Sequence, residues 1–141
     1  MEFPLKLHHS GFVVADIAAE VDGFVKSLGA EWNGCVYEDP YQSVKVTFLT
    51  TRRGDPQIEL VEPVGENSPV LRFLREKGGG LHHLCYETRD LEASMTELKA
   101  NGAMIARRAK PAVAFQGRRI AWMLTPQKLL VELLEAGDGG A

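Results

Sequence analysis

The sequence predicts an α+β fold in which one βαβββ half is followed by a second. Strand-like and helical stretches succeed one another in the same order twice, and chemically equivalent residues recur at a nearly fixed offset. The chain has 141 residues, 45% hydrophobic and 25% charged, which is typical of one globular domain. We therefore expect a single domain over residues 1–141, made of module 5–63 and module 80–135, which a linker helix over 68–77 joins.

The first half opens with an alternating stretch rich in Val and Phe, as in a strand. A helix follows, because Asp16 is a suitable N-cap, apolar residues recur at helical spacing, and Gly29 stands where a left-handed C-terminal residue is needed. Turn residues then separate three further strands. The strands expected in this half cover 5–15, 32–38, 44–50 and 57–62.

The second half repeats this order after the linker helix. Ser68-Pro69 predicts the N-cap and first residue of that helix, and the triple glycine that starts at Gly78 ends it. A strand follows, then a helix with Asp90 as its N-cap and Gly102 as its stop. The last three strands are expected over 103–108, 119–124 and 129–134.

The offsets between the halves single out two histidines and two glutamates. His9 and His83 are 74 residues apart, and Glu59 and Glu132 are 73 apart. In each half the histidine belongs to the first strand and the glutamate to the last. The same offsets relate the caps and the glycines, with 74 residues from Asp16 to Asp90 and 73 from Gly29 to Gly102.

Two imidazoles and two carboxylates form a mixed nitrogen and oxygen donor set, which suits a divalent Zn, Ni, Co, Mn or Fe ion. We therefore expect one metal site. Because side chains alternate along a strand, His82 faces away from His83, so we expect His82 and its counterpart His8 to be structural. Gln57 is a reserve ligand on the face of Glu59. The predicted ligands are His9, Glu59, His83 and Glu132.

Basic residues gather between positions 107 and 119, and arginine suits anion recognition. Arg119, which follows a Gly-Arg pair at the start of a predicted strand, is the candidate substrate-binding residue among them. The formal net charge of -3 argues against a nucleic-acid surface. No apolar run is long enough to span a bilayer, so a cytoplasmic protein is expected. Cys35 and Cys85 are expected to be reduced thiols without a catalytic role.

The sequence resembles the vicinal oxygen chelate superfamily, also called the glyoxalase and bleomycin-resistance superfamily. The resemblance runs from His9 to Glu135 and is closest to its methylmalonyl-CoA epimerase-like and glyoxalase-I-like members. The words that carry it are His9-Ser10-Gly11-Phe12-Val13-Val14, Ile58-Glu59-Leu60-Val61-Glu62-Pro63, Gly79-Gly80-Leu81-His82-His83-Leu84 and Val131-Glu132-Leu133.

The resemblance implies two βαβββ modules that form a cupped mixed sheet with helices outside, and a metal at the four residues already singled out. It implies an isomerase or lyase that moves a proton alpha to a carbonyl through a metal-stabilised enediolate, with Glu132 as the base. It also implies an acyl-CoA or thiol-adduct substrate and a homodimer. The strand over 44–50 contains no acidic residue, so a second catalytic carboxylate is not found there.

Two other functions are compatible with the sequence. An Fe(II) extradiol-type dioxygenase would use two histidines and one carboxylate, and the fourth candidate ligand, Glu59, argues against it. A non-catalytic small-molecule binder of the bleomycin-resistance kind often lacks the full ligand set, whereas this chain has all four residues.

Overall fold

The computed structural model describes residues 5–137, which contain nine strands and three α-helices. The chain divides into two compact units. The first unit is His9–His82, and the second joins the residues before His9 to those from His83 onward. The predicted α+β class is confirmed. The arrangement of modules 5–63 and 80–135 as a single domain stays a prediction.

The first unit contains a mixed sheet. Its strands lie in the order β2-β4-β5-β1, with β3 paired to β4. β1 and β5 are parallel, whereas β4 and β5 are antiparallel. Its elements are β1 (Lys6–Val13, whose first three residues belong to the second unit), α1 (Ile17–Leu28), β2 (Glu31–Trp32), β3 (Tyr37–Asp39), β4 (Val44–Thr50), β5 (Gln57–Pro63) and α2 (Leu71–Lys77).

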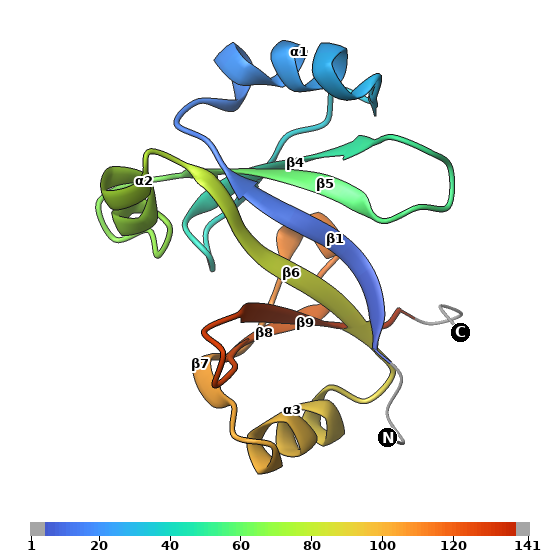
Figure 1. The fold of residues 1–141 in the computed structure, drawn as a ribbon, viewed down its shortest axis with the longest axis vertical. Coiled ribbons are helices and arrows are strands. Elements are labelled where there is room, and N and C mark those ends of the chain that lie inside the picture. The colour runs from blue at the N-terminus through green and yellow to red at the C-terminus, as the bar shows by residue number, and fades with distance from the viewer. Residues whose placement is uncertain (1–4, 138–141) are drawn as a thin grey trace. The chain divides into compact units, whose positions relative to one another are not determined.

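Helix α1 covers one face of this sheet and contacts β4 and β5 (Figure 1). The helix begins at Asp16, whose carboxylate accepts a hydrogen bond from the backbone N–H of Ala19, and ends at Gly29 with φ of 60°. Both predicted ends are confirmed. The buried residues between helix and sheet include Ile17, Leu49 and Leu60. The hydrophobic core therefore lies on the helix side of the strands.

The second unit repeats the arrangement in the strand order β6-β9-β8-β7. β6 and β9 are parallel, and β8 is antiparallel to both β9 and β7. Helix α3 packs on β7, β8 and β9 (Figure 1). The elements are β6 (Gly80–Thr88, whose first three residues belong to the first unit), α3 (Leu91–Ala100), β7 (Met104–Pro111), a 3₁₀ turn (Val113–Phe115), β8 (Arg119–Leu124) and β9 (Leu130–Glu135).

The single strand expected over 32–38 is wrong, because the chain forms two short strands there. β2 ends at Trp32 and β3 starts at Tyr37. Between them the Asn33 side chain accepts a hydrogen bond from the backbone N–H of Cys35 at 2.9 Å, and Gly34 has φ of 80°. This local turn removes the backbone from the extended conformation.

The expected start of the linker helix is also wrong. α2 begins at Leu71, and the side chain of Ser68 does not cap it. Instead, the carbonyl of Ser68 accepts a hydrogen bond from the backbone N–H of Leu71 at 3.2 Å, which forms a turn before the helix. The predicted end is confirmed, since Gly78 follows Lys77 with φ of 76°.

Among residues 5–137, none of the helices combines the length and the apolar composition needed to cross a bilayer.

Candidate functional site

In the first unit, His9 and Glu59 form a buried pair. His9 lies on β1 and Glu59 on β5, and the two residues are 0% and 5% exposed. In the parallel register His9 is aligned with Gln57 and Gly11 with Glu59, so His9 and Glu59 project from the same face. His9 Nε2 is 3.3 Å from Glu59 Oε1.

An aromatic ring completes this pair. Phe48 of β4 is aligned with Glu59 in the antiparallel register, so its side chain shares the same face. The Phe48 ring stands edge-on to the His9 imidazole, with 5.5 Å between the ring centroids. This contact limits rotation of the imidazole and covers it with an apolar group.

The second unit contains an equivalent pair. His83 of β6 and Glu132 of β9 are 5% and 3% exposed, and His83 Nε2 is 3.3 Å from Glu132 Oε1. Trp122 of β8 is aligned with Glu132, and its ring lies edge-on to His83 at a centroid distance of 4.7 Å. Each unit therefore has one histidine, one glutamate and one aromatic side chain in the same relation.

The distance within each pair is informative. Charge-assisted N–H···O hydrogen bonds are about 2.7–2.9 Å long, and 3.3 Å exceeds this. Two ligand atoms that each lie about 2.1 Å from one ion, at an angle of about 100°, are about 3.2 Å apart. The geometry of both pairs thus fits donors that share a cation, and a cation compensates for burying the carboxylates.

The remaining histidines pack against phenylalanines. The ring centroids of His8 and Phe115 are 5.4 Å apart in the second unit, and those of His82 and Phe73 are 4.9 Å apart in the first unit. These contacts agree with the structural role expected for both histidines. The reserve ligand Gln57 donates a hydrogen bond from its side-chain nitrogen to Thr50 Oγ1 at 3.3 Å.

Arg119 is bound by two carboxylates of its own unit. Its Nη2 lies 2.7 Å from Glu135 and 2.7 Å from Glu92. The hydrogen bond from Arg119 lowers the pKa of Glu135 below its ordinary value, and hydrogen bonds to Glu135 and then Glu92 raise the pKa of Arg119. An anionic substrate would have to compete with these carboxylates, so substrate binding by Arg119 stays a prediction.

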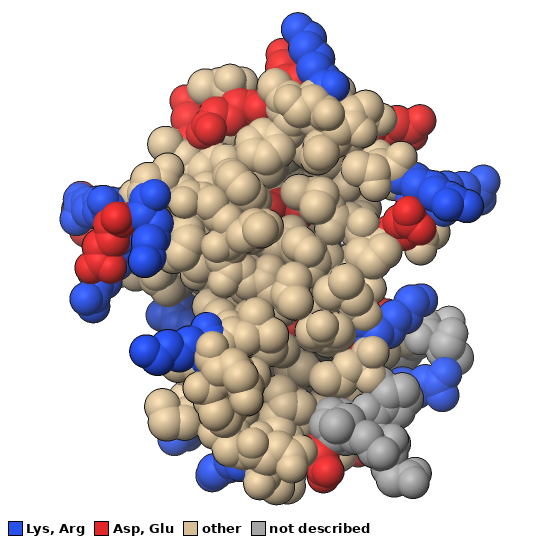
Figure 2. Space-filling view, viewed as in Figure 1, with Lys and Arg blue, Asp and Glu red and all other residues tan. Residues whose placement is uncertain are grey.

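The other basic residues of this region are arranged separately. Arg118 Nη1 is 2.9 Å from Glu87 Oε2, whereas Arg107, Arg108 and Lys110 lie on β7 at the end of the strand order. Charged side chains on an edge strand oppose pairing with other chains. On the face drawn in Figure 2, the described Lys and Arg side chains stand singly or beside Asp and Glu and form no continuous basic area.

The family comparison agrees with this site. Residues 8–122 match the family model of the Glyoxalase/Bleomycin resistance protein/Dioxygenase superfamily. The chain belongs to this superfamily. The match begins at the first residue before His9 and extends to Trp122, and it confirms the predicted family.

Superfamily relatives include curated epimerases. The chain is 34% identical over 119 residues to the ethylmalonyl-CoA/methylmalonyl-CoA epimerase of Cereibacter sphaeroides, a match that covers 84% of this chain and 87% of that protein. It is 33% identical over 95 residues to the human mitochondrial methylmalonyl-CoA epimerase, of which it covers 52%. These homologues are isomerases by name, and they confirm the predicted enzyme class.

Solved superfamily structures have the same fold. The methylmalonyl-CoA epimerase of Mycobacterium tuberculosis matches with a TM-score of 0.81 at 25% identity, over 95% of this chain and 89% of that one. A Streptomyces coelicolor methylmalonyl-CoA epimerase variant in complex with 2-nitronate-propionyl-CoA matches with a TM-score of 0.78 at 25% identity, over 96% of this chain and 100% of that one.

The sequence interpretation did not identify the aromatic partners of the two histidines. Phe48 and Trp122 are 74 residues apart, the same offset as His9 and His83. This offset was available in the sequence, but only the strand register shows that each aromatic residue stands beside its glutamate.

The Arg119–Glu135 pair makes stability depend on pH. Because the pKa of Glu135 is lowered in the folded protein, the pair stabilises the fold above the ordinary value of 4.5, and this contribution is lost as the pH falls through the folded-state pKa. We expect Glu135→Gln to lower the melting temperature by a few degrees near neutral pH, and the difference from the parent to shrink at acid pH.

Melting temperatures over a pH series check this. Glu76→Gln is the matched control, since Glu76 pairs with Arg72 through side chains that are 56% and 85% exposed, and such pairs contribute little. Equal losses in both variants, or a Glu135→Gln effect that grows as the pH falls, would contradict the assignment.

Proposed function

We propose that the chain is a divalent-metal-dependent epimerase that inverts the carbon alpha to the carbonyl of an acyl-CoA thioester. One observation carries this proposal: each unit supplies an equivalent buried His–Glu pair at 3.3 Å. The curated relatives named as ethylmalonyl-CoA and methylmalonyl-CoA epimerases support the substrate class.

In this proposal the two pairs hold one metal ion. Two imidazoles and two carboxylates suit a divalent Zn, Ni, Co, Mn or Fe ion. Such an ion, when bound, polarises a carbonyl oxygen and so makes the neighbouring C–H bond more acidic. The proposed ligands are His9, Glu59, His83 and Glu132.

Glu132 is the proposed base. Its carboxylate is 3% exposed, and its strand neighbour Trp122 is half-buried and covers the His83 ring. A carboxylate from which water is excluded is a stronger base than a hydrated one, because burial disfavours the charged form. Glu132 would accept the alpha proton, and Trp122 would keep His83 in a fixed orientation.

Inversion also requires a proton to reach the other side of the planar carbon. In the first unit, the β4 residues on the Glu59 face are apolar: Val44, Val46 and Phe48. β3 adds Tyr37 and Asp39 to that face, since they are aligned with Val46 and Val44. The Asp39 carboxylate accepts hydrogen bonds from two backbone N–H groups of the following turn.

Tyr37 is therefore the proposed second proton carrier. Diagonal neighbours on adjacent strands are about 7–8 Å apart, within reach of aromatic side chains, and Tyr37 is the diagonal neighbour of Phe48. Phe48 in turn contacts His9. The phenol is partly exposed and can exchange its proton with water.

Other predictions from the sequence stay open within this proposal. They are a thiol adduct as the alternative substrate, a role for Arg119, a homodimer and a cytoplasmic location.

The first prediction concerns proton exchange. In deuterated water, we expect the protein to exchange the alpha proton of methylmalonyl-CoA only when a divalent metal is bound. Chelation should abolish exchange, and added metal should restore it. Glu132→Gln should lower the rate by about 100-fold or more, because a positioned base contributes at least that much. Mass spectrometry of the recovered thioester measures the exchange.

His82→Ala is the control for this experiment, since His82 adjoins a proposed ligand but packs on Phe73. Exchange that continues after metal removal, or that Glu132→Gln leaves unchanged, would refute the proposed chemistry.

The second prediction separates the two proton carriers. Tyr37→Phe keeps the ring and removes only the hydroxyl, so we expect epimerisation to fall by about 100-fold. Exchange from the enantiomer that Glu132 deprotonates should persist. Circular dichroism of single enantiomers, read together with deuterium incorporation, distinguishes inversion from exchange.

Tyr41→Phe is the matched control, because Tyr41 lies in the turn after β3 and is 55% exposed. Loss of inversion in Tyr41→Phe with normal inversion in Tyr37→Phe would assign the second role to the wrong tyrosine.

A further inference from the structure

Cys85 lies beside a proposed metal ligand without belonging to the ligand set. It is fully buried on β6 and is aligned with Glu132 of β9. Period-two alternation puts it on the face of His83, two residues away. A thiol in this place is not needed by the proposed reaction.

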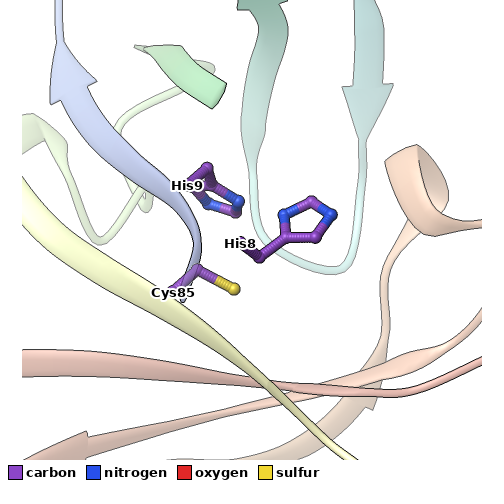
Figure 3. A group of neighbouring side chains, drawn as sticks. All are labelled: His8, His9 and Cys85. Atoms are coloured by element: carbon purple, nitrogen blue, oxygen red, sulfur yellow. The ribbon is translucent and has the colours of Figure 1, made fainter. Parts of the chain in front are cut away.

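His8 brings a nitrogen donor to this thiol. Both residues belong to the second unit, and a ring nitrogen of His8 lies within 4.8 Å of Cys85 Sγ. Figure 3 shows the two side chains as neighbours, together with His9, the next residue on β1. The His8 ring is half-buried and packs edge-on to Phe115.

We propose that His8 and Cys85 form a soft-metal site that captures cations such as Cd²⁺ or Cu⁺. Thiolate sulfur prefers soft cations, whereas the two carboxylates of the proposed centre prefer harder ones. Two donors bound to a tetrahedral ion at about 2.1 Å and 2.3 Å are about 3.6 Å apart, so a rotation of the His8 ring completes the pair. The thiol releases its proton to solvent when the metal–sulfur bond forms.

This site would select between metals. A soft cation held by Cys85 lies next to Glu132, the strand neighbour of Cys85. We therefore expect soft cations to inhibit the epimerase, a consequence that rests on the proposed function. The metal–sulfur bond itself does not depend on that function, so it is tested without an activity assay.

The second cysteine provides an internal control. Cys35 is exposed, lies in the first unit, and belongs to neither group of neighbouring donor residues found in residues 5–137. Likewise, His82 matches His8 in its edge-on contact with a phenylalanine.

The experiment titrates the full-length, metal-free protein with CdCl₂ and follows the ultraviolet absorption of the thiolate–cadmium bond. We expect a band that saturates at one equivalent in the parent, in Cys35→Ser and in His82→Ala. Cys85→Ser should lose the band, and His8→Ala should weaken cadmium binding at least tenfold while the band remains at saturation.

A band that survives in Cys85→Ser, that depends on Cys35, or that is missing from the parent would overturn the proposal. Unchanged affinity in His8→Ala would also overturn it, and this variant keeps the test decisive if Cys85→Ser does not fold. Melting curves of each variant identify any that are unfolded.

Discussion

A carboxylate buried on the face of a β-sheet needs a partner that replaces its lost hydration. In this protein Glu59 and Glu132 are each buried at 3.3 Å from a histidine. The parallel pairing of β1 with β5 and of β6 with β9 brings these partners together. Because a slip of one residue would turn every side chain to the opposite face, the buried pairs and the strand register depend on each other.

The two units meet this constraint with the same parts. Each has a helix that begins at an aspartate cap, a parallel strand pair that carries the histidine and the glutamate, and an aromatic ring beside the imidazole. The units differ in what surrounds the pair. Gly11 is aligned with Glu59, whereas Cys85 is aligned with Glu132. The first unit also has the additional strand β3, which carries Tyr37.

These differences suggest how a duplicated fold becomes asymmetric. Identical metal ligands in both halves cannot by themselves treat the two sides of a substrate carbon differently. Proton transfer that starts with Glu132 and ends with Tyr37 would make the halves unequal, and both residues lie on faces that the strand register defines. The thiol of Cys85 adds a second difference, which concerns the choice of metal.

Much of the fold could be predicted from the sequence because its signals are local or repeated. Asp16 caps α1 and Asp90 caps α3, and β4 and β8 have the predicted bounds. The His–Glu pairing followed from equal offsets and from side-chain alternation.

Other features depend on contacts that a linear reading does not contain. The turn at Asn33 interrupts a stretch with good strand propensity, through one side-chain hydrogen bond. Arg119 looked suited to anions, but Glu92 and Glu135 bind it from α3 and β9. The aromatic partners of the histidines could be assigned only once the register of β4 and β8 was known.

The central claim is that the two His–Glu pairs hold a single metal ion. Elemental analysis of the reconstituted protein, combined with His9→Ala and His83→Ala, tests it most directly. The account predicts one divalent ion per chain, and a loss of metal affinity of at least tenfold in each variant, because both histidines bind the same ion. Two ions per chain, with each variant losing only one, would contradict it.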